Sequence, residues 1–416
     1  MIAPLDQWIS ERTGLGDALD AEIMLQWQLD RLRSTIVYAR SNSRAYAVKL
    51  QGLNPDSIRR YSDLETLPFT TPAEVAADPV AFLCVSQSDV ARSTTITTSG
   101  TSGTRKRVFF TADDLERTVD FFDHGMRPMV ESGQRTLILM SGETEHSIGR
   151  LLQTGLARFG VAATIIRPEW SALDAVTAAR DADCIVGIPS QIHYLCRTDP
   201  SLRPQSVLLS ADYIPQPVIA ALEETWCCRV YTHYGMTETG FGCAVQCDAR
   251  QGQHVRSTDI LIEIVDPVTG RQQRHGEPGE IVLTMLRNQA MPLIRYRTGD
   301  RSQLVVGTCG CGSRLVRLGK VAGRYESDIC LVSGKVVSIH QLDNALYAVP
   351  GVRAVTARLD RKGNHELLHL TIDAEEKLDQ EIASAMKPIG VGYTVAYDTS
   401  NPFPFQGKRR LLVSYN

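Results

Sequence analysis

Residues 97–106 read TTSGTSGTRK, a Gly/Ser/Thr stretch that ends on a lysine and lies ahead of alternating predicted strands and helices. Consecutive backbone N–H groups in a Gly-rich turn form a concave anion site, and small hydroxyls add donors without bulk. Ser99, Thr101, Ser102 and Lys106 are therefore predicted to wrap a polyphosphate. The spacing is not that of a P-loop, and a flexible surface loop is the alternative interpretation.

Downstream of this loop the chain alternates between two patterns. Apolar runs typical of strands occur at 135–140, 161–166, 184–188 and 206–209, with helical stretches at about 147–159, 171–181 and 215–225. This alternation predicts a mostly parallel sheet covered by helices. Upstream, helical periodicity covers 17–50, and Thr71 and Pro72 are predicted as N-cap and first residue of a short helix.

The pattern changes after residue 255. Residues 260–271 and 280–286 predict antiparallel strands. From about 325, an α+β region is expected, with strands at 352–360, 366–373 and 393–398 and a helix at 374–386. The predicted fold class is α/β: a large N-terminal domain of helix-flanked sheets with a small antiparallel β subdomain (1–324), plus a small α+β C-terminal domain (325–416).

Bulk properties exclude several classes of protein. A net charge of −3 argues against a general nucleic-acid surface, which needs clustered excess Lys and Arg. No apolar run reaches the roughly 18–20 residues that span a bilayer, and the N-terminal residues lack signal-peptide features. A cytoplasmic protein is therefore expected. Its ten cysteines are then reduced thiols or metal ligands.

Three further motifs carry chemistry. In YGMTE (234–238), the Glu238 carboxylate suits Mg²⁺ and Thr237 can bond a phosphate, although a capping Thr beside an exposed Glu is the alternative. In YRTGD (296–300), Asp300 is expected where a strand ends in a tight Gly turn; it either accepts ribose hydroxyls or is a turn residue. Lys408 either neutralises charge that builds on a phosphate or belongs to a basic tail.

Cysteine and histidine residues suggest a metal site. Two pairs on separate loops, Cys247 with His254 and Cys309 with Cys311, suit tetrahedral Zn²⁺ with all four positions filled by protein, as in a structural site. Cys243 is the competing fourth ligand. The alternative is a set of reduced, partly buried residues.

Taken together, these motifs resemble the adenylate-forming superfamily of acyl-CoA synthetases, peptide-synthetase adenylation domains and luciferases. Within it, the stretches at 25–46, 64–75 and 309–324 are similar to the phenylacetate–CoA ligase and coenzyme F390 synthetase branch. The resemblance implies the adenylate-forming enzyme fold. It also implies ATP-dependent activation of a carboxylic acid, preferably aromatic, to an acyl-adenylate with release of pyrophosphate, then transfer to the thiol of CoA.

The resemblance also assigns roles to residues. Thr237 would lie beside the α-phosphate and Glu238 on Mg²⁺, while Lys408 would bridge carboxylate and phosphate. Asp300 and Arg324 would bind the ribose, and the hinge would lie at 326–328. The remaining nucleotide-binding residues would be those of the phosphate loop and the adenine site: Thr98, Ser99, Gly100, Thr101, Ser102, Gly103, Lys106, Ser210, Ala211, Asp212, Tyr234 and Gly235.

The acid is expected between the strand–helix region and YGMTE. The main pocket candidates are His146, Tyr213, Phe241 and Gly242; the wider set adds Phe121, Phe122, His124, Met126, Ile148 and Ile188. Arg105, Thr232 and a hinge one residue longer than usual depart from the family pattern. The acceptor is also open: a carrier protein, an amine or a hydroxyl could replace CoA. A non-catalytic nucleotide-binding scaffold is the third reading, and the oligomeric state is open, a homodimer included.

Overall fold

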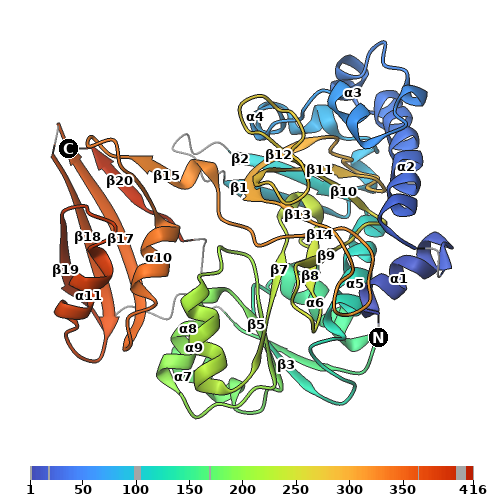
Figure 1. The fold of residues 1–416 in the computed structure, drawn as a ribbon. Helices are drawn as coiled ribbons and strands as arrows, with labels where there is room; N and C mark the ends of the chain where they lie inside the picture. The colour runs from blue at the N-terminus through green and yellow to red at the C-terminus, as the bar shows by residue number, and fades with distance from the viewer. Residues whose placement is uncertain are drawn as a thin grey trace. The chain divides into compact units, whose positions relative to one another are not determined.

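The computed structural model of the protein describes residues 2–16, 19–97, 105–167, 170–363, 365–399 and 409–415 (Figure 1). The chain forms two compact units. The first comprises 1–128, 154–159 and 233–322, and the second 129–153, 160–232 and 323–416. The domain boundary at 324–325 stays a prediction.

The second unit contains the predicted parallel strands. They lie in the order β4 (Ala162–Ile165), β3 (Arg135–Leu139), β5 (Cys184–Gly187), β6 (Ser206–Leu209), and the first residues of β7 (Arg229–Tyr234) pair with β6. Every residue of β5 and β6 is buried, because these short apolar runs are covered on both faces. Helices α7 (Ala172–Ala179), α8 (Pro189–Thr198) and α9 (Gln216–Trp226) lie together beside these strands (Figure 1). The prediction of a helix-covered parallel sheet is confirmed, whereas α8 was not predicted.

The C-terminal part of this unit is α+β, as predicted. Strands β17 (Val352–Lys362) and β18 (His365–Ala374) form a hairpin, flanked in the sheet by β20 (Leu412–Tyr415) and β19 (Tyr393–Tyr397). The remaining elements are η7 (Tyr325–Ser327), β15 (Asp328–Cys330), β16 (Val336–Ser338), α10 (Ile339–Leu346) and α11 (Asp379–Met386). The prediction of a helix from 374 was wrong at its start, because β18 continues to Ala374 and pairs there with Val352.

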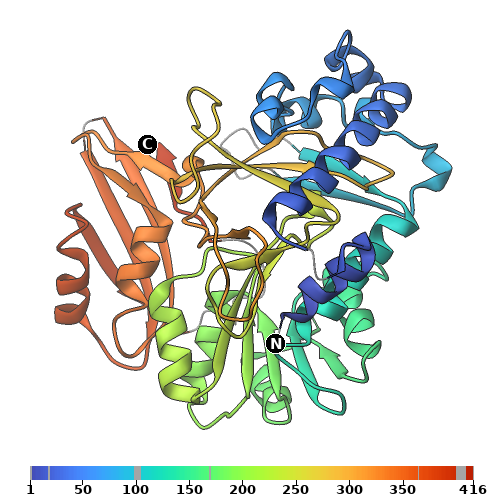
Figure 2. The ribbon, with the colours of Figure 1, turned by 45° about the vertical axis from the view of Figure 1, so that its right-hand side comes forward.

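The first unit begins with helices, which Figure 2 brings forward: α1 (Pro4–Thr13), α2 (Ala21–Asn42) and α3 (Arg44–Lys49). The helical periodicity predicted over 17–50 corresponds to two helices, α2 and α3. Ser43 is extended, ends α2, and caps α3 by accepting from the Tyr46 N–H. Thr71 caps α4 (Pro72–Ala77) as predicted and forms a capping box with Glu74. Short 3-10 turns complete this region: η2 (Pro55–Ser57), η3 (Tyr61–Thr66), η4 (Pro79–Phe82) and η5 (Gln87–Asp89).

The strands of the first unit are antiparallel. β1 (Arg92–Thr97) pairs with β2 (Arg105–Phe110), which leads into α5 (Ala112–Met126). β10 (Ile260–Val265), β11 (Gly279–Met285) and β12 (Tyr296–Ser302) form one sheet, which confirms the two predicted strands as antiparallel. The end of β7 pairs with β8 (Ala244–Gln246), which is followed in order by β9 (Gln253–Val255), β14 (Arg317–Leu318) and β13 (Leu304–Val305). The remaining elements are α6 (Ile148–Ala157), whose last residues belong to this unit, and η6 (Thr237–Thr239).

Two sequence predictions about local structure need correction. Asp300 does not follow the end of a strand: it lies inside β12, after Gly299, whose φ of 74° accompanies a register shift against β11. Lys106 belongs to β2, not to the loop before it. Among the described residues, no helix is both long and apolar enough to cross a membrane.

Candidate functional site

The predicted site residues divide between the two units. The first unit contains Lys106, Tyr234, Gly235, Thr237, Glu238, Phe241, Gly242, Asp300 and the four metal-ligand candidates. The second contains His146, Ser210, Ala211, Asp212, Tyr213 and Arg324. Thr98, Ser99, Gly100, Thr101, Ser102, Gly103 and Lys408 lie outside the described residues.

A buried polar triad is the central feature of the first unit. Lys106 of β2 forms an ion pair with Glu238 of η6, and the side chains are only 7% and 4% exposed. The Tyr296 hydroxyl, from β12, donates to Glu238 Oε1 at 2.8 Å and lies 2.6 Å from Lys106 Nζ. Three segments remote in the sequence therefore meet at one carboxylate.

The lysine keeps this carboxylate charged. Burial alone would raise the pKa of Glu238, but the Lys106 ammonium and the hydrogen bonds that the carboxylate accepts lower it below its usual value. Glu238 is thus a buried anion at neutral pH. The alternative of an exposed Glu in YGMTE is wrong, because Glu238 is 3% exposed.

A second polar contact joins two other motif residues. The Tyr234 hydroxyl, at the end of β7, donates to Asp300 Oδ2 of β12 at 2.8 Å. Both side chains are buried. Tyr234, predicted at the adenine, and Asp300, predicted at the ribose, are therefore neighbours in the structure.

The segment between these residues is tightly packed. A Cβ on Gly235 would lie 2.1 Å from the Phe241 carbonyl oxygen, and one on Gly242 would lie 2.4 Å from the Phe121 ring. Phe241 itself has a φ of 73° and lies under the Arg92 guanidinium, 4.8 Å from its ring centroid. Glycine is required at both positions, which fixes the path of the chain around Glu238.

The wider pocket candidates on α5 are packed in the first unit. Phe121 and Phe122 lie 5.9 and 6.4 Å from the His233 ring, and His124 stacks on Trp8 at 5.6 Å. Phe121, Phe122 and His124 therefore pack against other aromatic rings of the first unit. Their contact with an acid stays a prediction.

In the second unit, the predicted adenine segment contacts the C-terminal region. Asp212 Oδ2 accepts from the Arg409 N–H at 2.7 Å. The Tyr213 hydroxyl accepts from Asn344 Nδ2 at 2.7 Å, and its ring lies 4.3 Å from that of His340. Ser210 is buried, whereas Ala211 has a φ of 68° and His146 is half-buried in the segment between β3 and α6.

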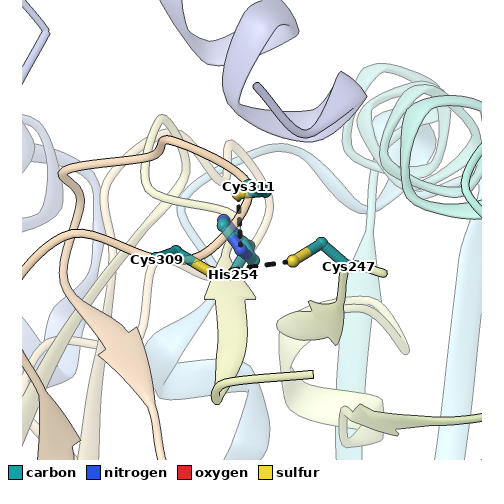
Figure 3. A group of neighbouring side chains, drawn as sticks. All are labelled: Cys247, His254, Cys309 and Cys311. Carbon is teal, nitrogen blue, oxygen red and sulfur yellow. Dashed lines mark hydrogen bonds between the residues drawn. The ribbon is translucent and has the colours of Figure 1, made fainter. Parts of the chain in front are cut away.

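The four predicted metal ligands come together in the first unit (Figure 3). Their ligand atoms all lie within 4.8 Å of one another. Cys247 Sγ lies 3.7 Å from Cys309 Sγ, and Cys311 Sγ lies 3.7 Å from His254 Nε2. Tetrahedral bonds of about 2.3 Å to sulfur and 2.0 Å to nitrogen place ligand atoms about 3.5–3.8 Å apart. The four residues therefore fit zinc. Cys243, the predicted competitor, is buried but is not part of this group.

Local structure holds these ligands in place. His254 lies on β9, not on a loop as predicted, and the turn at 247–250 closes through the Arg250 N–H to the Cys247 carbonyl. The turn that carries the other two cysteines closes through the Cys309 N–H to the Ser313 carbonyl at 2.8 Å. Burial leaves Cys247 and Cys309 only 3% and 2% exposed.

Asp6 of α1 supports the histidine. His254 Nδ1 lies 3.0 Å from both carboxylate oxygens of Asp6, so Nδ1 carries a proton and Nε2 faces the sulfurs. Burial lowers the pKa of His254, but Asp6 and Cys247 raise it overall to about 11. Burial raises the pKa of the Cys247 thiol, but the neighbouring His254 more than offsets this effect, and the pKa falls to about 7. His254 is thus protonated beside the Cys247 thiolate, and a metal ion held by this group would displace the proton on Nε2.

Two residues of these sites were missed in the sequence. Tyr296 stands in the YRTGD motif, so its position could have marked it. Asp6 is 248 residues from its histidine, and nothing near it in the sequence indicates a ligand-supporting role.

Comparison with known proteins shows the family of the chain. The family model of AMP-binding enzymes matches residues 25–287. The phenylacetate–coenzyme A ligase of Thermus thermophilus is 26% identical over 386 residues, 88% of this chain and 85% of that protein. That of Escherichia coli is 26% identical over 368 residues, 84% and 82% of the two chains. The crystal structure of 2-hydroxyisobutyryl-CoA ligase in the postadenylation state superposes with a TM-score of 0.78 at 19% identity, over 94% of this chain and 89% of that one.

The family model covers well over half of the chain, and the relatives extend over most of it. The matched region contains the YGMTE motif and ends shortly before YRTGD. The chain belongs to the AMP-binding enzyme family, in its phenylacetate–coenzyme A ligase-like branch of AMP-forming acid–CoA ligases.

Proposed function

We propose that this ligase activates an aromatic carboxylic acid of the phenylacetate type, with Glu238, Lys106, Asp300 and Lys408 as its working residues. The buried triad is the observation that carries the assignment of these roles. A charged carboxylate 3% exposed is costly to the fold, and it is neutralised by a lysine that directly follows the Gly/Ser/Thr loop.

In this proposal Glu238 binds Mg²⁺ together with the phosphates of ATP. When bound, the cation neutralises charge on the phosphates during displacement. With Mg²⁺ held by Glu238, the Lys106 ammonium would no longer be its only positive partner and would contact a phosphate oxygen. Tyr296 keeps its hydrogen bond to Glu238 and holds the carboxylate in place.

Asp300 accepts the ribose hydroxyls. The Tyr234 hydroxyl donates to its Oδ2 at 2.8 Å and so fixes the orientation of the carboxylate. Lys408 contacts the carboxylate of the acid and the α-phosphate. The acid oxygen attacks the α-phosphorus, the bond to the bridging oxygen breaks, and pyrophosphate leaves with that electron pair. The CoA thiol then loses its proton and attacks the acyl carbon of the adenylate, the bond to the phosphate oxygen breaks, and AMP leaves as the thioester forms.

The Cys247, His254, Cys309 and Cys311 group is proposed to hold structural zinc. With four protein ligands the ion has no open position, so its role is to join the 247–254 and 309–311 segments. Asp6 would add α1 to this assembly through His254.

Pyrophosphate release tests the function and the acid. The panel is phenylacetate, benzoate, 2-hydroxyisobutyrate and acetate, each with ATP and Mg²⁺, with and without CoA. Phenylacetate should give the highest kcat/KM. A clear preference for 2-hydroxyisobutyrate would contradict the aromatic acid, and no release with any acid would contradict the proposal.

Variants test the roles of the residues. Glu238→Gln should lower kcat for pyrophosphate release by about 100-fold, because an interaction of the transition state is lost. Glu280→Gln is the matched control, since Glu280 is also buried in the first unit and bonds Arg297 at 2.9 Å. Equal losses in both variants would make Glu238 a purely structural residue.

The same assay separates the alternatives. Pyrophosphate release without a CoA thioester would favour a carrier protein, an amine or a hydroxyl as acceptor. For the scaffold alternative, Lys408→Ala is decisive: adenylation should be lost while ATP binding persists. Unchanged adenylation in that variant would remove Lys408 from the mechanism.

A further inference from the structure

One face of α10 contacts both the 210–213 segment and the residue that follows Lys408. His340, Asp343, Asn344 and the C-cap Tyr347 recur at the spacing that places side chains on one side of a helix. His340 and Asn344 contact Tyr213. The backbone N–H of Gln216 also donates to Asn344 Oδ1 at 3.2 Å.

Asp343 and Tyr347, on the same face, contact Arg409. Asp343 is 2% exposed, and Arg409 Nε donates to its Oδ1 and Oδ2 at 2.8 and 2.9 Å. The guanidinium also donates to the Val355 carbonyl of β17 and lies 5.4 Å from the Tyr347 ring centroid. All of these residues belong to the second unit.

The main chain at Arg409 is held as well. Its N–H, which belongs to the peptide bond with Lys408, donates to Asp212 Oδ2 at 2.7 Å. Arg409 is the residue that directly follows Lys408 in the chain. Lys408 itself lies outside the described residues.

We propose that Asp343 is a positioning residue for adenylation: by binding Arg409 it holds the peptide next to Lys408 against the 210–213 segment. This inference rests on the proposed function, in which Lys408 acts on the acid and the α-phosphate. Asp343 contacts neither of them. Its effect comes through Arg409, and it is confined to the half-reaction that uses Lys408.

A second buried pair in the same unit provides a matched control. Arg353 of β17 binds Asp373 of β18 at 2.7 Å, with side chains 16% and 1% exposed, against 16% and 2% for Arg409 and Asp343. Asp343→Asn and Asp373→Asn therefore remove the same charge from equally buried pairs. Only the first pair adjoins Lys408, so a purely structural role predicts equal effects.

The experiment measures the two half-reactions separately. Pyrophosphate release with phenylacetate, ATP and Mg²⁺ reports adenylation, and thioester formation from synthetic phenylacetyl-AMP and CoA reports the second step. Asp343→Asn should lower kcat for pyrophosphate release by about 10–100-fold, because small misplacements of a reacting group cost this much. Thioester formation by Asp343→Asn should stay near the wild-type rate. Asp373→Asn should stay near the wild-type rate in both half-reactions. Hydrogen exchange across 409–415 should rise in Asp343→Asn relative to Asp373→Asn.

Three results would overturn the inference. They are equal losses in the two variants, an equal loss of both half-reactions in Asp343→Asn, and unchanged exchange over 409–415. A wild-type enzyme that releases no pyrophosphate would refute the proposed function itself, and that failure is seen before any variant is compared.

Discussion

The ion pair between Lys106 and Glu238 allows a prediction about stability. Replacing Lys106 by Met removes the cation and leaves a buried carboxylate with the Tyr296 hydroxyl as its remaining partner in the triad. Breaking a buried pair in this way costs about 3–5 kcal/mol, because the remaining charge stays desolvated. Lys106→Met should therefore lower the free energy of unfolding by about this amount.

Removing both charges should cost less than removing one. In Lys106→Met/Glu238→Gln no unpaired ion remains, so the double variant should be more stable than Lys106→Met by at least about 2 kcal/mol. Millimolar Mg²⁺ should restore part of the stability of Lys106→Met alone, because the carboxylate then regains a cation. Urea denaturation followed by circular dichroism, with and without Mg²⁺, measures each step.

An exposed pair in the same unit is the control. Lys49 and Glu74 are paired with side chains 17% and 42% exposed, and such surface pairs are coupled by about 0–1 kcal/mol. Their double-mutant cycle should be close to additive. If the Lys106–Glu238 cycle were equally additive, or if Lys106→Met cost less than about 1 kcal/mol, the reasoning about the buried charge would be wrong.

Three further predictions concern other parts of the molecule. Asp6→Asn should weaken zinc binding by about 10–100-fold in a chelator competition, because the carboxylate orients the histidine ligand; an affinity equal to that of Asp20→Asn would contradict this. Asp300→Asn should lower kcat/KM for ATP by about 10–100-fold, the effect of losing a charged acceptor for the ribose, and unchanged kinetics would exclude that contact. Burial lowers the pKa of His193 to about 4. The neutral, buried histidine therefore contributes fully to stability above the pKa that it has in the unfolded chain, and this contribution is lost as the pH falls from there toward 4. Relative to His193→Gln, the wild type should lose about 2 kcal/mol of unfolding free energy between pH 7 and pH 5, and parallel pH profiles would refute this.

Much of the fold follows from local pattern. The buried runs of β3, β5 and β6 are continuous apolar segments between helical ones, so their type and parallel pairing are predictable from the sequence. Thr71 and Pro72 mark a helix start by short-range chemistry alone. The helix α8 was missed because its buried residues include Ser190, Gln191 and His193, polar types that do not mark a core helix in a sequence.

Local pattern misplaced structure at Ser43 and at Asp300. Ser43 interrupts a long helical period because its side chain caps the next helix. Beside Gly299, Asp300 is predicted as a turn residue. In the structure β12 pairs with β11 on both sides of Gly299, so the glycine produces a register shift within the strand and not a turn.

Residue type and spacing are enough to predict the family, the order of the motifs and the four metal-ligand candidates. The burial of Glu238 against Lys106 and Tyr296, the contact of Asp6 with His254 and the binding of Arg409 by Asp343 are visible only once the chain is folded. Each of these contacts joins segments remote in the chain. Their energies come from burial and charge, which a linear pattern does not contain.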